Sequence, residues 1–267
     1  MIIATPAMRR SRLAGKTFKI TVCGKSVSAT ICEKILGVIV NNQFTHQHHM
    51  HGDKSDPKAP LPGLISQLSK RVGMLARLVH LVQAQRFKTL TNGLFVSKLL
   101  YAIEFYGVTR GTETLRDCDS RYNSFTKSHL EALQTLCNKV MRLITGHGYD
   151  TPVLQLLEAA DMLSINQLIH YTTLTTCFKV KNSTKPLYLA QRLGFLDAPV
   201  RRNRRKQTKP PVDFDLSTAR QGYMYRAAKG WSSLPVHLKE ETRERPFKKG
   251  LRKWVALNVP PLPQRQT

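Results

Sequence analysis

The hydrophobic positions of this chain follow two different periods, and the change from one to the other divides the sequence. Residues 18–22 (FKITV) alternate apolar and polar side chains and lead to a glycine at Gly24, a pattern typical of a strand followed by a hairpin turn. Strand character is also found at residues 1–5, 26–29 and 35–40. Gly37 interrupts the last of these. Residues 1–45 are therefore predicted to form a small β element, too small to be stable alone.

From Pro62 onward the apolar residues recur every three or four positions, the period of a helix that buries one face. Three such helices are predicted between residues 62 and 148. Their apolar seams are Ile65, Leu68, Val72, Leu75, Val79 and Val82; then Phe87, Leu90, Leu94 and Tyr101, widened by Leu99, Leu100 and Ile103; then Leu130, Leu133, Cys137, Val140 and Ile144. Because a small sheet cannot cover three seams, we expect the helices to pack on one another as a bundle.

The remaining segments are assigned by composition. Residues 46–61 are expected to form a loop, and residues 149–196 a second helical block that begins after a Pro152 cap. Residues 197–216 form a basic linker and residues 217–267 a short helical unit with a proline-rich tail. The predicted fold is mainly α, with a small N-terminal β-hairpin or sheet and a helical bundle followed by further helices.

Positive charge narrows the choice of partner. The chain has 267 residues, 41% of them hydrophobic, so it can bury a core, but 42 lysines and arginines against 17 acidic residues give a net charge of +25. Nucleic acid, whether RNA, DNA or a hybrid, is the polyanion such a protein most often meets. The candidate contacts are Lys70, Arg71 and Arg77 in the first helix and Arg201, Arg202, Arg204, Arg205 and Lys206 in the linker. The alternatives are a solvated helix face and a solvated linker.

Other partners and locations are less favoured. The sequence has no apolar run long enough to span a bilayer, so no membrane partner is expected. Arginines follow the first eight residues, too early for a secretory signal, and the five cysteines form no Cys-x-x-Cys pair. An intracellular protein is expected, and a nuclear one if the basic run acts in import.

Catalytic and metal motifs are not found in the sequence. The close carboxylate pairs, Asp117 with Asp119 and Asp213 with Asp215, lie in predicted loops with no strands to fix them. A Gly-x-Ser-x-Gly elbow and a glycine-rich phosphate loop are also missing. A histidine cluster stands at His46, His48, His49 and His51. Four histidines in a loop do not converge as metal ligands must, so no metal site is predicted.

Six segments together resemble one known family. Residues 18–25 (FKITVCGK) and 33–40 (EKILGVIV) resemble the hairpin and K-x-LGV segment that follow the catalytic palm in reverse transcriptases of non-LTR retrotransposons. The family's thumb helix and later boxes resemble residues 71–78 (RVGMLARL), 100–108 (LYAIEFYGV), 133–146 (LQTLCNKVMRLITG) and 225–235 (YRAAKGWSSLP). The chain departs from the family's pattern at three positions. It has Ala102 where the family commonly has a proline, and Asn138 and Lys139 where the family usually has glutamine and arginine.

The resemblance implies a C-terminal thumb and tail portion of an RNA-directed DNA polymerase, without the palm. The family's catalytic aspartates and Mg²⁺ belong to the palm, so no catalytic residue, cofactor or polymerase activity of its own is expected for this chain. In the family the K-x-LGV strand lies near the primer terminus, which implies that Lys34 and Gly37 face nucleic acid. The alternative is that Lys34 is merely exposed and its apolar neighbours are sheet core.

Three functions remain open from the sequence. The first is a fragment that binds nucleic acid without sequence preference through its basic helices and linker. The second is a helical module whose apolar seams dock a protein partner. The third is a relic of a mobile element with no selected function.

Overall fold

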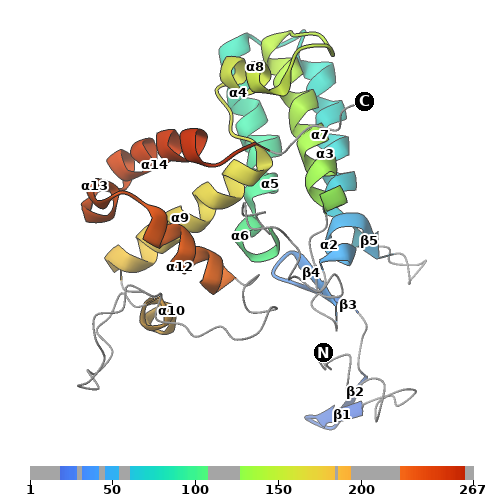
Figure 1. Ribbon diagram of the computed structural model, residues 1–267. Coiled ribbons are helices and arrows are strands. Elements are labelled where there is room, and N and C mark those ends of the chain that lie inside the picture. Colours follow the sequence, from blue (N-terminus) through green and yellow to red (C-terminus); the bar gives the residue numbers. More distant parts are fainter. Residues whose placement is uncertain are drawn as a thin grey trace. The chain divides into compact units, whose positions relative to one another are not determined.

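The computed structural model describes residues 19–28, 32–41, 46–53, 61–107, 127–183, 186–193 and 223–261. The protein is mainly α-helical, with small antiparallel hairpins in its N-terminal part, as predicted (Figure 1). It divides into two compact units, residues 1–102 with 122–147 and residues 103–121 with 148–267. The hairpins and the bundle therefore share the first unit, and the two C-terminal helical segments share the second. The predicted strand at residues 1–5 and the linker at 197–216 lie outside the described residues.

Two hairpins open the described part of the first unit. Strand β1 (Lys19–Val22) pairs with β2 (Lys25–Ser28), and β3 (Cys32–Ile35) pairs with β4 (Val38–Asn41), both antiparallel. Each turn has two residues at positive φ, which are Cys23 (48°), Gly24 (75°), Leu36 (46°) and Gly37 (83°). Such turns follow the right-handed twist of the strands they join.

Gly37 does not interrupt a single strand, so the predicted strand at 35–40 is wrong. Its φ of 83° and that of Leu36 reverse the chain, and the segment becomes the two strands β3 and β4. All four residues of β4 are buried, whereas Ile35 in β3 is 45% exposed. The alternative in which Ile35, Leu36 and Val38 all belong to a sheet core thus holds for Val38 only.

The predicted loop at 46–61 contains a short helix. Helix α2 (Gln47–His51) is followed by β5 (Gly52–Asp53), which pairs with β6 (Leu61–Pro62). Met50 is fully buried, and α2 contacts β4 and the first bundle helix. A five-residue helix has no long apolar period in the sequence, which is why composition alone predicted a loop.

A helical bundle makes up the rest of the first unit. It comprises α3 (Leu64–Leu78), α4 (Ala84–Thr91), the π-helix η1 (Asn92–Val96), α5 (Ser97–Leu100) and α7 (Lys127–Thr145). Helix α3 packs on α7 and on η1, and α4 packs on α7. Side chains from all of these helices form the core, among them Leu68, Leu75, Phe87, Phe95, Leu99, Leu133 and Val140. The predicted bundle is confirmed.

The buried face of the second bundle helix differs from the predicted seam. Leu90 is 36% exposed and Tyr101 is 49% exposed, although both were expected to be buried. The buried side chains recur every fourth residue, at Phe87, Thr91, Phe95 and Leu99. A π-helix takes more residues per turn than an α-helix, so η1 rotates the residues that follow it, Tyr101 among them, relative to an α-helical projection. Leu90 precedes η1, so this rotation does not explain its exposure.

The second unit is organised around one buried helix. Its helices are α6 (Ile103–Tyr106), α8 (Val153–Ala160), α9 (Ile165–Ser183), α10 (Leu187–Arg192), α12 (Tyr223–Ser233), α13 (Val236–Glu240) and α14 (Glu244–Asn258). Helix α9 contacts α6, α10, α12 and α14. Leu174 and Phe178 of α9 form a core with Phe247, Leu251 and Val255 of α14. The rings of Phe178 and Phe247 stack with centroids 4.0 Å apart.

Polar contacts and one glycine fix α14 and the chain that follows it. Gln167 of α9 donates to the carbonyl oxygen of Val259 at 2.9 Å, and Asn166 donates to that of Pro260 at 3.0 Å. Gly250 faces α13, where an added Cβ would lie 2.6 Å from Leu238 Cδ2. The C-terminal helices are thus built into the same unit as α9.

Arg226 ties α12 to α6. Its guanidinium donates to the carbonyl oxygen of Glu104 at 2.9 Å and to that of Gly107. The carbonyl groups at the end of a helix lack partners within the helix, so this fork satisfies two of them.

We predict that Arg226→Lys lowers the free energy of unfolding by about 1–3 kcal/mol. A lysine keeps the charge but cannot present the planar fork that reaches both carbonyls. Chemical denaturation would measure the change, with Arg245→Lys on the exposed surface as the control, expected within about 0.5 kcal/mol of the parent chain. An equal effect of the two substitutions would contradict a specific role for the fork.

Candidate nucleic-acid interface

The tip of the β3–β4 hairpin is fixed by Tyr101. The Tyr101 hydroxyl donates to the carbonyl oxygen of Leu36 at 2.5 Å. Its ring also lies against Gly37, where an added Cβ would be 3.3 Å from Tyr101 Cε1. Gly37 is therefore required twice, by its positive φ and by the close ring. These contacts hold the K-I-L-G-V segment at the end of α5.

Leu36 is unusual in its position. It has a φ of 46° and its residue surface is 86% exposed. The left-handed conformation costs a non-glycine residue about 1–2 kcal/mol, and asparagine or glycine is the usual occupant of this turn position. Leu36 gains little burial in exchange, so its conformation and its exposure are both unfavourable in the isolated chain.

A small cavity of about 70 Å³ lies beside this hairpin. Its walls come from β3, β4, α2, β6, α3 and α5. Six of the residues that line it are Lys34, Gly37, Ile39, His49, Gln67 and Lys98. Among the residues that the structure describes, no acidic one lines the cavity.

Lys34 and Lys98 line this cavity, and Arg71 lies near Lys98. The pKa of Lys98 is lowered, first by burial and then by the nearby charges of Arg71 and Lys34. Arg71 is half-buried and donates to the carbonyl oxygen of Leu94 in η1. The Lys98 ammonium lies 6.0 Å from the centroid of the Tyr101 ring. Three like charges from β3, α3 and α5 repel one another, and a bound anion would relieve that repulsion.

The chemistry that this arrangement supports is anion binding. Ammonium groups and the Gln67 amide are donors, and the cavity volume is about that of two water molecules, enough for one oxyanion group. Lysine is a common partner for phosphate. Among the described residues, no three His, Cys, Asp or Glu side chains are grouped as ligands for a metal ion.

The structure brings together some of the predicted site residues. Lys34 and Arg71 both lie near enough to Lys98 to lower its pKa. Lys98 was not among the predicted site residues, because a single lysine between Val96 and Leu99 looks like the solvated edge of an apolar helix. Lys70 and Arg77 are exposed and lie seven residues apart, on another face of α3. The run Arg201, Arg202, Arg204, Arg205 and Lys206 lies outside the described residues.

Lys70 lines a second, more open hollow of about 420 Å³. Ser66 and Ser69 line it from the same helix, and His51 lines it from α2. Arg77 donates from Nε to the carbonyl oxygen of Gly73 at 3.3 Å and so lies along its own helix. Of the predicted cations in the described residues, Lys34 and Arg71 have the neighbours that favour an anion most.

The histidine cluster holds α2 to its surroundings. His49 Nδ1 accepts the backbone N–H of Ile39 at 3.3 Å, and His48 Nδ1 lies 3.2 Å from Asn41 Nδ2. His51 Nε2 lies 3.0 Å from Nε2 of His129 on α7. These contacts link α2 to β4 and to α7, a structural role that the sequence did not predict.

Two of these imidazoles are neutral at physiological pH. Burial, followed by the charges of His46 and Lys98, lowers the pKa of His49 to about 4. Burial, followed by His51, lowers the pKa of His129 to about 4. Because Nδ1 of His49 accepts a hydrogen bond, the proton of the neutral ring is on Nε2.

In comparisons with protein-family models, curated proteins and solved structures, none matched this chain. Of the helices in the described part of the chain, none is both long and apolar enough to cross a membrane.

We predict that Leu36→Asn raises the free energy of unfolding by about 0.5–1 kcal/mol, because asparagine adopts the left-handed conformation more easily than leucine. Urea denaturation would measure this. Leu36→Val is the contrasting variant, since a β-branched residue is less tolerant of positive φ and should destabilise the chain. If Leu36→Asn lowered stability, the leucine side chain would be packing within the fold.

The neutral state of His49 predicts a dependence of stability on pH. Between about pH 6.5 and 4 the unfolded imidazole binds a proton and the folded one does not, so stability falls as pH falls through this window. We expect His49 alone to account for a loss of about 1–2 kcal/mol between pH 7.5 and 5.

His49→Asn keeps an acceptor for the Ile39 N–H and should make the stability–pH curve shallower by this amount. His147→Asn, at an exposed position beyond α7, serves as the control and should leave the curve unchanged. Urea unfolding at a series of pH values is the measurement. A curve for His49→Asn that is parallel to that of the parent chain would contradict the neutral, buried state of His49.

Proposed function

We propose that the chain acts as a nucleic-acid-binding thumb and tail portion of a non-LTR retrotransposon reverse transcriptase, inside the cell and without polymerase activity of its own. The observation that carries the proposal is a cavity lined by Lys34 and Lys98, with Arg71 near enough to Lys98 to lower its pKa. This cluster would contact a backbone phosphate, and such contacts have no sequence preference. The interaction needs no metal or cofactor.

The resemblance and the geometry support each other at one segment. In the family the K-x-LGV segment is expected near nucleic acid, and here Lys34 and Gly37 of that segment both line the cationic cavity. The exposed Leu36 lies at the tip between them in the sequence. A base or sugar packed on this leucine would supply the burial that the chain itself does not give it.

A protein-docking module has less support. That hypothesis needs unpartnered apolar seams, but Leu68 and Leu75 of α3, Leu133 of α7 and Phe247 of α14 are each fully buried within their own unit. The exposed large apolar residues, such as Leu81, Leu154 and Leu257, come from separate helices and turns. Single exposed residues of this kind are normal for a monomer.

The test is fluorescence anisotropy of a labelled RNA–DNA hybrid titrated with the complete chain at several salt concentrations. We expect affinity to fall steeply with salt. Lys34→Gln with Lys98→Gln should weaken binding about tenfold and lower the slope of log affinity against log salt by about 1–2, one unit or less for each lost phosphate contact. A parent affinity that does not change with salt would contradict the proposal.

A matched control removes the same charge elsewhere in the first unit. Arg86→Gln with Lys139→Gln changes two exposed cations away from the cavity and should have a much smaller effect. A further variant measures how much of the binding affinity comes from the linker. In it, alanine replaces Arg201, Arg202, Arg204, Arg205 and Lys206. If the control pair weakened binding as much as the cavity pair, net charge alone would explain the affinity and the cavity would have no special role.

A further inference from the structure

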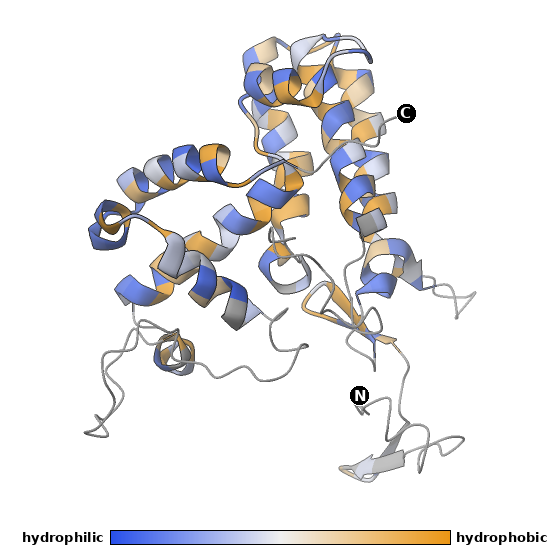
Figure 2. Cartoon of the chain, in the orientation of Figure 1, coloured by the Kyte–Doolittle hydropathy of each residue, from blue (hydrophilic) through white to orange (hydrophobic). Residues whose placement is uncertain are grey.

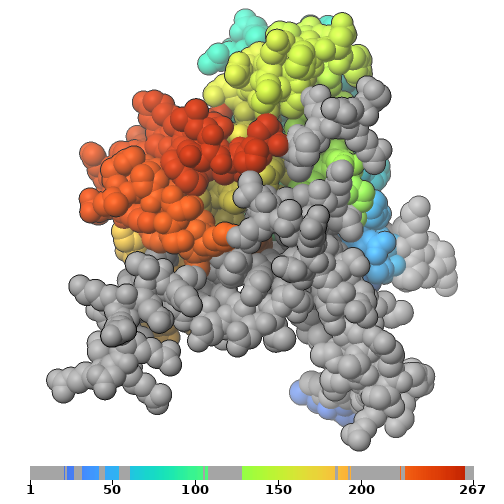
Figure 3. Space-filling view, viewed as in Figure 1, coloured from blue at the N-terminus to red at the C-terminus, as the bar shows by residue number. Residues whose placement is uncertain are grey.

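Helix α14 carries five cations in the second unit. Its buried side consists of Phe247, Leu251 and Val255, each fully buried. The cations are Arg245, Lys248, Lys249, Arg252 and Lys253. Three of them are exposed and two, Lys248 and Arg252, are half-buried, and α14 is visibly hydrophilic along much of its length (Figure 2). The helix also forms part of the visible surface of the molecule (Figure 3).

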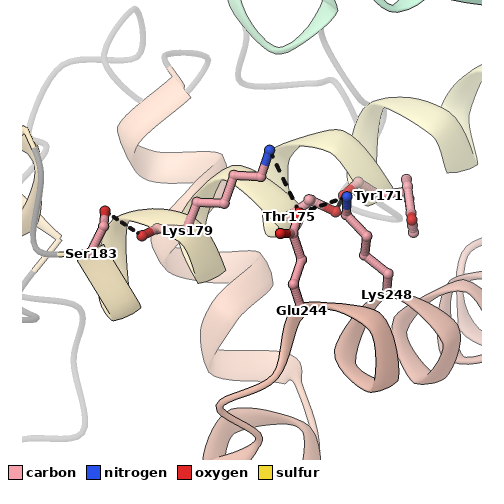
Figure 4. A network of polar contacts seen from close by, with 6 residues as sticks. All are labelled: Tyr171, Thr175, Lys179, Ser183, Glu244 and Lys248. Carbon is pink, nitrogen blue, oxygen red and sulfur yellow. Dashed lines mark hydrogen bonds and ion pairs between the residues drawn. The ribbon is translucent and has the colours of Figure 1, made fainter.

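Two of the five cations are paired with carboxylates. Lys248 Nζ lies 2.7 Å from Glu244 Oε1, which also forms an ion pair with Lys179 Nζ of α9 at 3.7 Å (Figure 4). Arg252 Nη2 lies 2.8 Å from Asp161 Oδ1. The Lys248–Glu244 pair lies within α14, whereas Lys179 joins Glu244 to α9 and Arg252 joins α14 to the end of α8.

The other three cations form a line. Arg245, Lys249 and Lys253 are all exposed, and within the described ranges none of them has an ion-pair partner. They are spaced four residues apart, so successive charges are separated by about 6 Å along the helix axis. We call these three residues the α14 ridge.

The ridge is unfavourable for the helix that carries it. Like charges four residues apart repel one another on a helix, and the ridge contains two such pairs. Arg245 is in the first turn and the last turn has no cation, the reverse of the arrangement that the helix dipole favours. The chain therefore places these cations where its own fold gains nothing from them.

The buried apolar face of α14 and the spacing of the ridge cations favour nucleic acid over a lipid surface as the partner. A basic amphipathic helix binds a lipid surface through its apolar face, but the apolar face of α14 is already buried in the core. A spacing of about 6 Å is comparable with the separation of successive phosphates along one nucleic-acid strand. A strand can thus meet the three cations in order, with no change in the helix.

We propose that the α14 ridge is a second nucleic-acid site, in which Arg245, Lys249 and Lys253 contact successive phosphates of one strand. The partner class rests on the proposed function, but the surface is separate from the cavity of Lys34 and Lys98 and belongs to the other unit. Phosphate contacts alone fix no sequence, so this site binds RNA and DNA strands of any sequence.

The test compares two triple variants of the complete chain. The ridge variant is Arg245→Gln, Lys249→Gln and Lys253→Gln. The control is Arg243→Gln, Lys248→Gln and Arg252→Gln, which removes the same charge from α14 and its cap but takes cations that pair with Glu241, Glu244 and Asp161. A labelled single-stranded oligonucleotide is the probe, with anisotropy at several salt concentrations and thermal unfolding as the two readouts.

Affinity and stability should change in opposite ways. The ridge variant should bind about tenfold more weakly, with a salt slope lower by about 2, and should unfold at the same or a higher temperature. The control variant should lose less affinity and unfold at a lower temperature, because it breaks ion pairs. Equal affinity of the ridge variant and the parent chain would contradict the proposal that the α14 ridge binds nucleic acid.

The outcomes separate this proposal from the function proposed above. If the cavity variant Lys34→Gln with Lys98→Gln loses affinity and the ridge variant does not, the proposed function stands and the ridge fails. If the ridge variant loses affinity and the cavity variant does not, the α14 ridge is supported as a binding site and the cavity is not. A parent chain that does not bind the oligonucleotide overturns both. Loss of binding by the ridge variant only to phosphatidylserine–phosphatidylcholine vesicles would assign the surface to lipid and overturn the nucleic-acid site.

Discussion

Repulsion between unbalanced positive charges is the constraint on which the rest of this molecule depends. With 42 lysines and arginines and 17 acidic residues, the chain has 25 cations more than it can match one to one. The fold uses its few carboxylates at joints, as Glu244 does between α9 and α14. Part of the surplus in the described residues lies at Lys34, Arg71 and Lys98 and along one line of α14. Gathered cations weaken the isolated protein and strengthen its attraction to a polyanion, so both effects follow from one distribution of charge.

Much of the fold could be predicted from periodicity, because long amphipathic helices repeat one pattern over many residues. The seam of α3 and that of α7 lie where the three- and four-residue spacing indicated. Short elements escaped prediction for the same reason. Helix α2 has five residues, and its stability comes from imidazole contacts with β4 and α7, which no local pattern encodes. The turn at Gly37 was predicted as a break within a strand, because leucine is an improbable partner for glycine in a tight hairpin.

The candidate site could be predicted only in part. Lys34 and Arg71 were expected to bind nucleic acid from charge and from the resemblance, but their meeting with Lys98 depends on tertiary structure. The α14 ridge was overlooked because the sequence shows five cations in nine residues without showing which have partners. Pairing of Lys248 with Glu244 is local and could be inferred from the four-residue spacing. The partner of Arg252 is Asp161, far away in the sequence, and only the structure identifies it.

The π-helix η1 sets the rotational phase of the cationic cavity. It lies between α4 and Lys98, so it determines the direction in which Lys98 leaves the helix. Its Leu94 carbonyl also accepts a hydrogen bond from Arg71, so the same turn holds a second cation in place. Each residue added to or removed from a helix rotates everything beyond it by about 100°. A π-turn holds about one residue more than an α-turn, so loss of a single residue from η1 can be absorbed when the turn closes as an α-helix. A further residue inserted into η1 would instead turn Lys98 away from Lys34 and Arg71, while leaving the composition and net charge of the chain almost unchanged. For this protein, an insertion of one residue in that turn is a greater threat to the site than many substitutions on its surface.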